Sequence, residues 1–181
     1  MNSCASNGYG HVMSSRRTFL RLVALGGAAG LMAGPWLERT ALAAGQADAL
    51  LLSCMDYRLV DAVGQYMVGR GLKGQYDQVI LAGASLGAVT HKYREWNRTF
   101  WEHLDTAIQL HGIQRVIVMD HRDCGAYKLV LGDDLARDPA KETAVHTSTL
   151  RSLRQQIVAK HKTLEVELLL MSLDGRVEAV G

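Results

Sequence analysis

Short apolar runs alternate with amphipathic stretches along most of this chain. The runs have the length and composition of buried strands, and they are Ala49–Ser53, Val79–Ala82, Val116–Met119 and Val166–Met171. All but the last lie between helix-like stretches, the pattern of a parallel sheet whose strands are joined by crossover helices. The sequence therefore predicts an α/β fold with a mostly parallel sheet flanked by helices.

Apolar residues at helical spacing fill the segments between these runs. One helix is predicted from positions 59–67, and a second from positions 93–108, with Gly112 well placed to end it. A third helix is expected from about Lys141 to Lys160, after Asp138-Pro139. These three helices supply the crossovers that a parallel sheet requires.

The end of the chain predicts a hairpin. Asp174-Gly175 is a turn signal, and a short last strand is expected up to Val180. Residues 44–181 are enough for one domain with one core, and they contain no internal repeat, low-complexity tract or interdomain linker. We expect a single α/β domain with a C-terminal hairpin strand.

The N-terminal segment reads as an export signal. Ser15–Arg21 holds the adjacent arginines of a twin-arginine signal, a Gly/Ala-rich apolar run follows, and Ala41-Leu42-Ala43 offers a small-residue cleavage site. Residues 1–43 are therefore expected to direct export by the twin-arginine route, to the bacterial periplasm. The alternative is an uncleaved membrane anchor, but the run is short and glycine-rich for a bilayer core of about 30 Å.

The net charge of the chain gives no evidence for a polyanionic partner. The predicted signal holds four of the 20 Lys and Arg residues and one of the 18 Asp and Glu residues, which leaves 16 basic and 17 acidic residues in 44–181. A domain this close to neutral has no broad basic surface for nucleic acid or an acidic membrane. After signal cleavage we expect no nucleic-acid binding and no stable membrane insertion.

Two short motifs hold the candidate chemistry, Cys54-Met55-Asp56-Tyr57-Arg58 and His121-Arg122-Asp123-Cys124-Gly125. Two cysteines and a histidine form a three-ligand set for a catalytic zinc that keeps its fourth position open. The ligands directly follow the first and third predicted strands, and open α/β sheets build their sites at the carboxyl ends of strands. If these strands are neighbours, the ligands converge.

With these residues in view, the chain resembles the β-class carbonic anhydrases. That family carries Cys-x-Asp-x-Arg after its first strand and His-x-x-Cys-Gly after its third, and both patterns are present here. The resemblance implies reversible hydration of carbon dioxide (CO₂) to bicarbonate and a proton, by attack of zinc-bound hydroxide. It also implies one Zn²⁺ per subunit held by Cys54, His121 and Cys124, and a homodimer or higher homo-oligomer.

The same resemblance implies that Asp56 and Arg58 form the catalytic dyad. A bidentate Asp–Arg pair would hold the carboxylate away from zinc and let it accept a hydrogen bond from the water. If the pair breaks, Asp56 can become a fourth zinc ligand and close the site, an arrangement that occurs in the family. The alternative for both residues is a surface salt bridge.

The chain departs from the family pattern at two places. Tyr57 stands where many members have serine, so it must find a pocket or alter the surface beside the dyad. Ala82-Gly83-Ala84-Ser85 stands where the family often shows Arg-Asn-Ala-Gly.

Two alternative functions keep the zinc site: a related zinc hydrolase acting on carbon disulfide (CS₂) or carbonyl sulfide (COS), and a non-catalytic zinc-binding protein. Gly83-x-Ser85-x-Gly87 also matches a serine-hydrolase elbow.

Other interpretations of these residues remain open. Cys54 and Cys124 can instead be core cysteines or a disulfide, and Asp123 can bond within its turn or orient a ligand. Gly125 allows a close backbone approach.

Five histidines outside the two motifs are candidate proton shuttles or helix-surface residues: His91, His103, His111, His146 and His161. An aromatic cluster is expected in the core, with Trp101 reaching a subunit interface: Trp96, Phe100 and Trp101.

Overall fold

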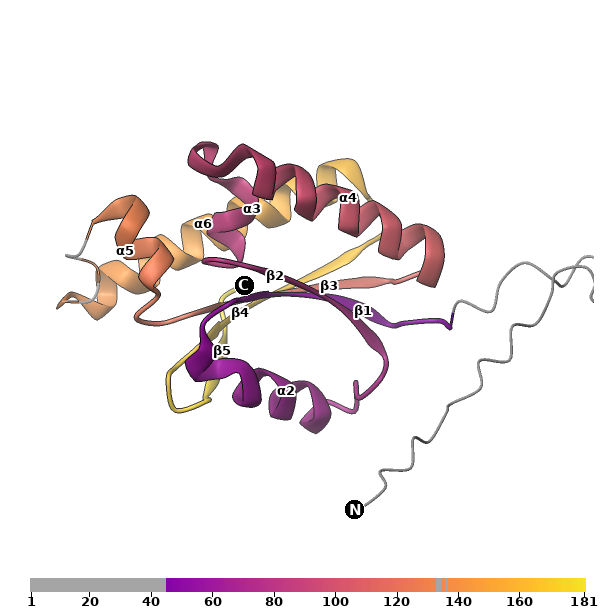
Figure 1. Ribbon diagram of the computed structural model, residues 1–181, viewed down its shortest axis with the longest axis horizontal. Coiled ribbons are helices and arrows are strands. Elements are labelled where there is room, and N and C mark those ends of the chain that lie inside the picture. The colour runs from indigo at the N-terminus through magenta and orange to yellow at the C-terminus, as the bar shows by residue number, and fades with distance from the viewer. Residues whose placement is uncertain (1–44, 133–134, 136) are drawn as a thin grey trace, which may run out of the picture. The chain divides into compact units, whose positions relative to one another are not determined.

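A five-stranded sheet forms the centre of the protein (Figure 1). The computed structural model describes residues 45–132, 135 and 137–181, and the predicted export signal lies outside them. The strands are β1 (Ala49–Cys54), β2 (Tyr76–Leu81), β3 (Arg115–His121), β4 (Glu165–Met171) and β5 (Val177–Ala179). They are ordered β2-β1-β3-β4-β5, and only β5 runs antiparallel to its neighbour. The predicted mostly parallel sheet with a C-terminal hairpin strand is confirmed.

Helices cover both faces of this sheet. In Figure 1, α2 lies on one face, and α3, α4 and α6 lie on the other. The helices are α2 (Val60–Gly69), α3 (Ser85–Val89), α4 (Arg94–His111), α5 (Gly125–Leu131) and α6 (Pro139–Lys160), with short 3₁₀ turns η1 (Tyr57–Leu59) and η2 (His91–Tyr93). None of the described helices is long and apolar enough to cross a membrane.

Burial on both faces explains the continuous apolar runs. In β1, Leu50 and Leu52 pack with α4 and α6, whereas Leu51 packs with α2 on the opposite face. A strand covered on both sides carries no polar alternation. β2 lies at the edge, and its Gln78 and Ile80 are exposed. The apolar run therefore marked only the second half of this strand.

The helix predictions hold except at their ends and for two short helices. α6 begins at Pro139 because the Asp138 side chain accepts hydrogen bonds from the N–H groups of Ala140 and Lys141, which caps the helix. The sequence-based start at Lys141 was late. The five-residue α3 and seven-residue α5 were missed, because helices this short show no complete amphipathic period.

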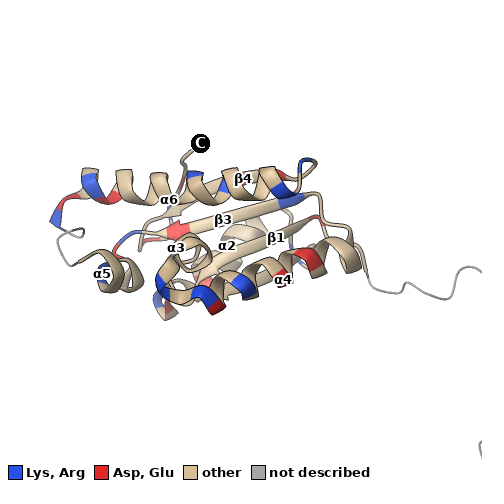
Figure 2. Cartoon of the chain, turned by 90° about the horizontal axis from the view of Figure 1, so that it is seen from above, with Lys and Arg blue, Asp and Glu red and all other residues tan. Residues whose placement is uncertain are grey.

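Charged residues of both signs are interspersed along α4 in Figure 2, whereas α6 carries mainly basic ones. On α4, Arg98 forms ion pairs with Glu95 at 2.5 Å and with Glu102 at 3.7 Å. All three side chains are largely exposed, so these pairs contribute little to stability. Arg98 is therefore a suitable control for arginine substitutions elsewhere.

Gly87, on α3, packs closely against the end of β2. A Cβ atom there would lie 2.8 Å from the carbonyl oxygen of Ala82 and 3.0 Å from Cβ of Leu81. We expect Gly87→Ala to lower the free energy of unfolding by about 1–3 kcal/mol through this overpacking. Gly64→Ala on α2 is the matched control, since no atom lies within 4 Å. Urea denaturation of both variants tests this, and a Gly87→Ala protein as stable as the wild type would contradict it.

Candidate metal site

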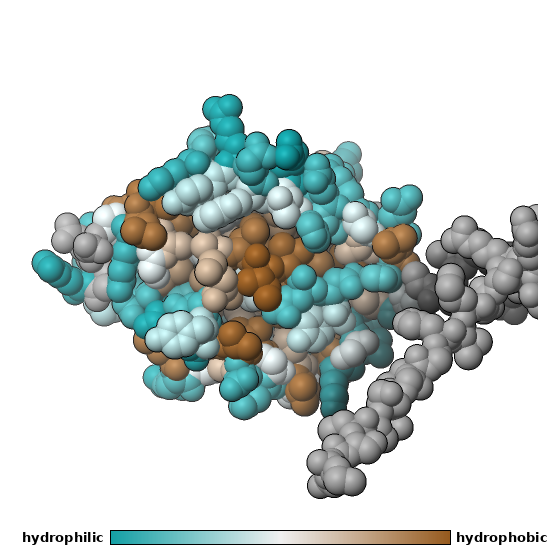
Figure 3. All heavy atoms as spheres, in the orientation of Figure 1, coloured by the Kyte–Doolittle hydropathy of each residue, from teal (hydrophilic) through white to brown (hydrophobic). Residues whose placement is uncertain are grey.

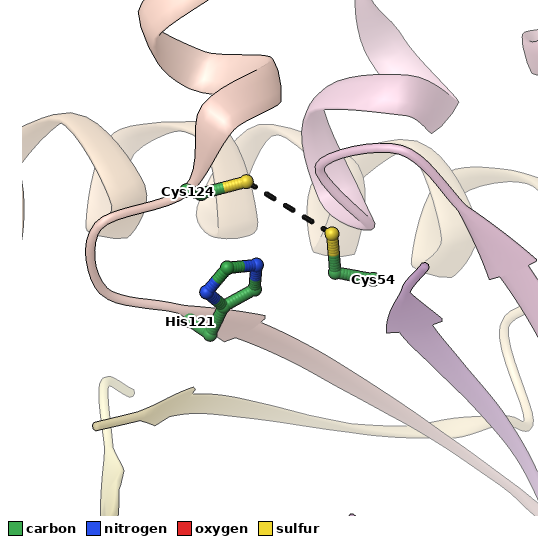
Figure 4. Close-up of side chains that lie close together, drawn as sticks. All are labelled: Cys54, His121 and Cys124. Atoms are coloured by element: carbon green, nitrogen blue, oxygen red, sulfur yellow. Dashed lines mark hydrogen bonds between the residues drawn. The ribbon is translucent and has the colours of Figure 1, made fainter. Parts of the chain in front are cut away.

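Three side chains with metal-binding atoms meet at the carboxyl ends of β1 and β3 (Figure 4). Cys54 is the last residue of β1, His121 is the last residue of β3, and Cys124 immediately precedes α5. β1 and β3 are hydrogen-bonded neighbours. Consequently the ligand atoms of the three residues all lie within 4.8 Å of one another.

The two cysteines are spaced for a shared ion. Their Sγ atoms lie 3.9 Å apart and both thiols are free. A disulfide requires about 2.05 Å, so the structure does not form the disulfide considered from the sequence. Two sulfurs bound at about 2.3 Å to one tetrahedral ion lie roughly 3.8 Å apart. The spacing fits a metal held between the two thiolates.

His121 presents an unused nitrogen to the same point. The side chain is 3% exposed, and its Nδ1 lies 2.8 Å from the carbonyl oxygen of Arg122. A carbonyl only accepts hydrogen bonds, so Nδ1 carries the proton and Nε2 has the free lone pair. Nε2 is buried without a hydrogen-bond partner in the described structure. Burying such an atom is unfavourable, and a metal ion would satisfy it.

The electrostatics favour a thiolate at Cys54. The hydrogen bond from Cys124 lowers the pKa of Cys54 to about 4, against the effect of burial, and the Gly83 N–H, 3.3 Å from Sγ, contributes. The pKa of Cys124 is raised because it is hydrogen-bonded to Cys54. Burial lowers the pKa of His121, but the nearby Cys54 thiolate and the hydrogen bond to the carbonyl of Arg122 outweigh it and raise that pKa above its ordinary value. These shifts favour a thiolate at Cys54 and a protonated thiol at Cys124.

Metal binding must therefore displace protons. We expect zinc addition to release one proton from Cys124, and a second one from His121 where the pH is low enough for its imidazole to be protonated. The number of protons released falls as the pH rises, because His121 then loses its proton to solvent before zinc is added. The raised pKa of His121 moves this change to higher pH. Zinc titration in weakly buffered indicator solution measures it. Zinc bound with no proton release would contradict the ligand assignment.

Asp56 and Arg58 form a close ion pair beside these ligands. Arg58 donates from Nε to Oδ1 of Asp56 at 3.0 Å and from Nη2 to Oδ2 at 2.7 Å. These hydrogen bonds lower the pKa of Asp56 to about 2, so its carboxylate is ionised at neutral pH. Oδ2 of Asp56 lies 3.8 Å from Nε2 of His121. The bidentate pair expected from the sequence is formed at the edge of the cluster.

Asp123 holds Arg58 from the other side. Arg58 Nη1 donates to Oδ2 of Asp123 at 2.9 Å, and Nη2 donates to its backbone oxygen at 3.1 Å. Lys128 also pairs with the Asp123 carboxylate. Asp123 adopts a positive φ of 56°, so it shapes the turn with its backbone while its side chain fixes Arg58. The sequence suggested a turn or ligand-orienting role and gave no sign of this contact.

An open pocket of about 580 Å³ lies over these residues. Its lining includes Cys54, Asp56, Arg58 and Cys124. Apolar side chains stand at its edge, with Met55 65%, Tyr57 85% and Leu129 76% exposed. Tyr57 thus occupies the surface beside the dyad and fills no interior pocket. The volume is within the range of small-molecule sites.

Comparisons with known proteins give the family. The family described as "Putative carbonic anhydrase" matches residues 45–181. The chain belongs to this family. It is 39% identical over 135 residues to an uncharacterized protein of Rickettsia conorii, covering 75% of this chain and 73% of that one. A Rickettsia bellii protein shows the same identity over 75% and 82% of the two chains.

Solved β-carbonic anhydrases share the fold. The crystal structure of the β-carbonic anhydrase CafA of Aspergillus fumigatus matches with a TM-score of 0.50 at 14% identity, over 75% of this chain and 76% of that chain. At this identity, the match shows the fold alone. The carbonic anhydrase-like domain thus has a β-carbonic anhydrase fold with a Cys-His-Cys cluster that can hold a metal.

Ser85 of this carbonic anhydrase-like domain is not an exposed nucleophile. Its side chain is fully buried, and Oγ donates to Oδ2 of Asp120 at 2.7 Å. His146, which lies near enough to suggest a triad, bonds through Nδ1 to Asp120 and not to Ser85. A serine nucleophile needs a base within reach of its hydroxyl. The hydrolase alternative is therefore wrong for this fold.

The remaining histidines do not join the cluster. Among the described residues, His121 is the one histidine of the metal-binding group. His146 is buried rather than on a helix surface, and His111 pairs with Asp77 at 2.6 Å.

Phe100 is fully buried, and Trp101 packs edge-on against it with ring centroids 5.1 Å apart. The expected aromatic core is present, and the subunit interface at Trp101 stays a prediction.

Proposed function

We propose that this protein is a zinc-dependent carbonic anhydrase that reversibly hydrates CO₂ to bicarbonate and a proton. The observation that supports this most is the position of the Asp56–Arg58 pair at the edge of the Cys54–His121–Cys124 cluster. A purely structural zinc site closes its coordination with a fourth protein ligand. Here the group in the described residues has three ligands, and two of them, Cys54 and Cys124, line an open pocket, as a catalytic site requires.

Zinc is the metal that this donor set favours. Thiolate and imidazole ligands at tetrahedral spacing are typical of Zn²⁺. When bound, zinc supplies a Lewis acid that lowers the pKa of water and so provides hydroxide for attack on CO₂. Two thiolates neutralise the charge of the ion, so we expect a smaller shift than in three-histidine sites, where the pKa falls to about 7. Activity should therefore grow toward alkaline pH.

The protein's own residues position the reactants. Asp56 remains ionised because of Arg58, so its carboxylate can accept a hydrogen bond from the attacking water. Arg58 holds that carboxylate in a bidentate pair, and Asp123 fixes the guanidinium from its far side. This arrangement orients the water lone pair before CO₂ arrives, which lowers the entropic cost of the reaction. Oδ2 of Asp56 lies 3.8 Å from Nε2 of His121, so if Arg58 released this carboxylate, Asp56 could serve as a fourth ligand to a bound zinc ion.

The apolar edge of the pocket supports a second candidate substrate class. Met55, Tyr57 and Leu129 favour small uncharged molecules, and this includes COS and CS₂ as well as CO₂. Discrimination between such similar molecules depends on pocket shape more than on metal ligands.

Stopped-flow CO₂ hydration by the zinc-loaded full-length chain near pH 8.5 tests the proposal, with COS and CS₂ hydrolysis assayed in parallel. We expect CO₂ hydration well above the buffer rate. Sulfide release without CO₂ hydration would identify the hydrolase, and a folded, zinc-loaded protein inert to all three substrates would indicate a non-catalytic zinc-binding protein.

We also propose that the protein forms a homodimer through the β2 edge. Val60, Val68 and Ile80 lie on α2 and β2 and are 65%, 53% and 55% exposed. Figure 3 shows hydrophobic residues reaching the surface between α2 and the helices above the sheet. An unpaired strand edge with apolar neighbours is a ready site for a second copy. Ile80→Lys should shift the protein to monomer in light scattering, whereas an unchanged mass would exclude this edge.

We propose further that residues 1–43 are a twin-arginine signal and that residues 44–181 act in the periplasm. A folded export route suits a protein with two zinc thiolates, because metal loading before export protects them from oxidation. Replacement of Arg16 and Arg17 with lysines should retain the protein in the cytoplasm of a bacterial host. Fractionation with the unchanged chain as control measures this.

A further inference from the structure

A buried carboxylate, that of Asp120, lies one residue before His121 on β3. Its side chain is 0% exposed. Oδ1 accepts a hydrogen bond from the Ser85 N–H at 2.9 Å. Oδ2 accepts from the Ser85 hydroxyl at 2.7 Å, the Tyr127 hydroxyl at 2.6 Å and Nδ1 of His146 at 2.9 Å. A charge removed from water is tolerated only when it is satisfied in this way.

The donors come from three different helices. Ser85 is the first residue of α3, Tyr127 lies in α5, and His146 lies in α6. The rings of Tyr127 and His146 also contact each other, with centroids 3.9 Å apart. Asp120 therefore joins the end of β3 to the starts of α3 and α5 through one carboxylate.

Two of these connections lead directly to the cysteine ligands. Ser85 follows the turn of Gly83 and Ala84, and the Gly83 N–H lies 3.3 Å from Sγ of Cys54. This turn is strained, because Ala84 has a positive φ of 43° without being glycine. On the other side, Tyr127 follows Cys124 by about one helical turn, and Cys124 is the residue immediately before α5. The bonds to Asp120 hold both segments in place.

We propose that Asp120 is a positioning residue for the metal site: its four hydrogen bonds fix the turn that donates to Cys54 and the helix that begins directly after Cys124. The inference rests on the metal site of the proposed function and does not depend on the substrate. Loss of the Asp120 carboxylate leaves all three ligands in the chain but relaxes the turn that donates to Cys54 and the helix that follows Cys124. Such supporting groups typically change metal affinity by about 10–100-fold.

Asp120→Asn tests this in the full-length chain. Asparagine keeps the shape but offers one acceptor oxygen, and its amide group faces donors. We expect zinc affinity, measured by chelator competition, to weaken about 10–100-fold, and the visible absorption of the Co²⁺-loaded protein to shift. Tyr127→Phe removes one donor only, so it should change both readouts in the same direction by less. Wild-type affinity and an unchanged cobalt spectrum in Asp120→Asn would overturn the proposal.

A matched control separates positioning from general stability. Leu153 is fully buried on the same side of the sheet and lies outside this network. Leu153→Ala should lower the unfolding midpoint yet keep the zinc affinity and the cobalt spectrum. Equal weakening of zinc binding in Leu153→Ala would overturn the proposal. Should Asp120→Asn fail to fold, Tyr127→Phe decides, and wild-type zinc affinity in that folded variant would overturn it.

The positioning role of Asp120 and the proposed CO₂ hydration can fail separately. A wild-type chain that binds zinc but does not hydrate CO₂ would refute the proposed activity, and a weakened affinity in Asp120→Asn would still support the positioning role. A wild-type chain that binds neither zinc nor cobalt would overturn both.

Discussion

Replacing Cys124 with serine is expected to abolish zinc binding and CO₂ hydration together. Cys124 contributes one of the two sulfurs, 3.9 Å apart, between which the metal would lie. A serine hydroxyl stays protonated at neutral pH and is a poor ligand for Zn²⁺, which prefers thiolate, imidazole and carboxylate. Zinc content should fall from about one ion per chain to near none. Elemental analysis of desalted protein and the hydration assay give both readouts.

The matched control for this variant is Cys4→Ser. It makes the same chemical change in the predicted export signal, and it should leave zinc content and activity at the wild-type level. Circular dichroism should show that Cys124→Ser keeps its secondary structure, since the core clusters on both faces of the sheet are untouched. A Cys124→Ser protein that retains a full equivalent of zinc would contradict the assignment of the site.

Replacing Arg58 with alanine should have the second largest effect, and of a different kind. Arg58 donates to Asp56 and Asp123 and to none of the metal ligands, so zinc should stay bound. The carboxylate of Asp56, however, loses the partner that orients it. We expect CO₂ hydration to fall by about 100-fold or more, the range for removing a positioned proton-handling group. Zinc analysis and stopped-flow hydration of the same sample separate the two effects.

The loss in this variant should not come from protonation of Asp56. Arg58 lowers the pKa of Asp56 to about 2, and without it the pKa should return toward the ordinary value of about 3.9. Asp56 is ionised at pH 8.5 in either case, so the variant should stay impaired across the alkaline range. Arg98→Ala, at an exposed helix position, is the control and should retain activity. Full activity in Arg58→Ala would refute the catalytic role of the pair.

Much of the fold was predictable from sequence because its strands are buried on both faces. The continuous apolar runs of β1, β3 and β4 and the Asp174-Gly175 hairpin led to a mostly parallel sheet with one antiparallel strand. Less was predictable where local signals are weak. The first half of β2 carries exposed residues at the sheet edge, and α3 and α5 are too short to show a period.

The candidate site was likewise predictable from the sequence only in part. Cys54, His121 and Cys124 were identifiable because they lie at or shortly after the carboxyl ends of two strands, and strand order brings such positions together. The contacts of Asp123 with Arg58 and of Asp120 with Ser85 join residues far apart in the chain. No local pattern indicates such pairs. A charged residue at the end of the apolar strand β3 was the one signal that pointed to Asp120.

The most direct test of the account is a zinc titration of metal-free, full-length protein followed by CO₂ hydration at about pH 8.5. The Cys54–His121–Cys124 cluster is the one metal-binding group in the described structure. Activity should therefore rise linearly and stop rising at about one equivalent of zinc per chain. A hydration rate that stays at the buffer level while zinc binds to saturation would contradict the proposal that this site hydrates CO₂.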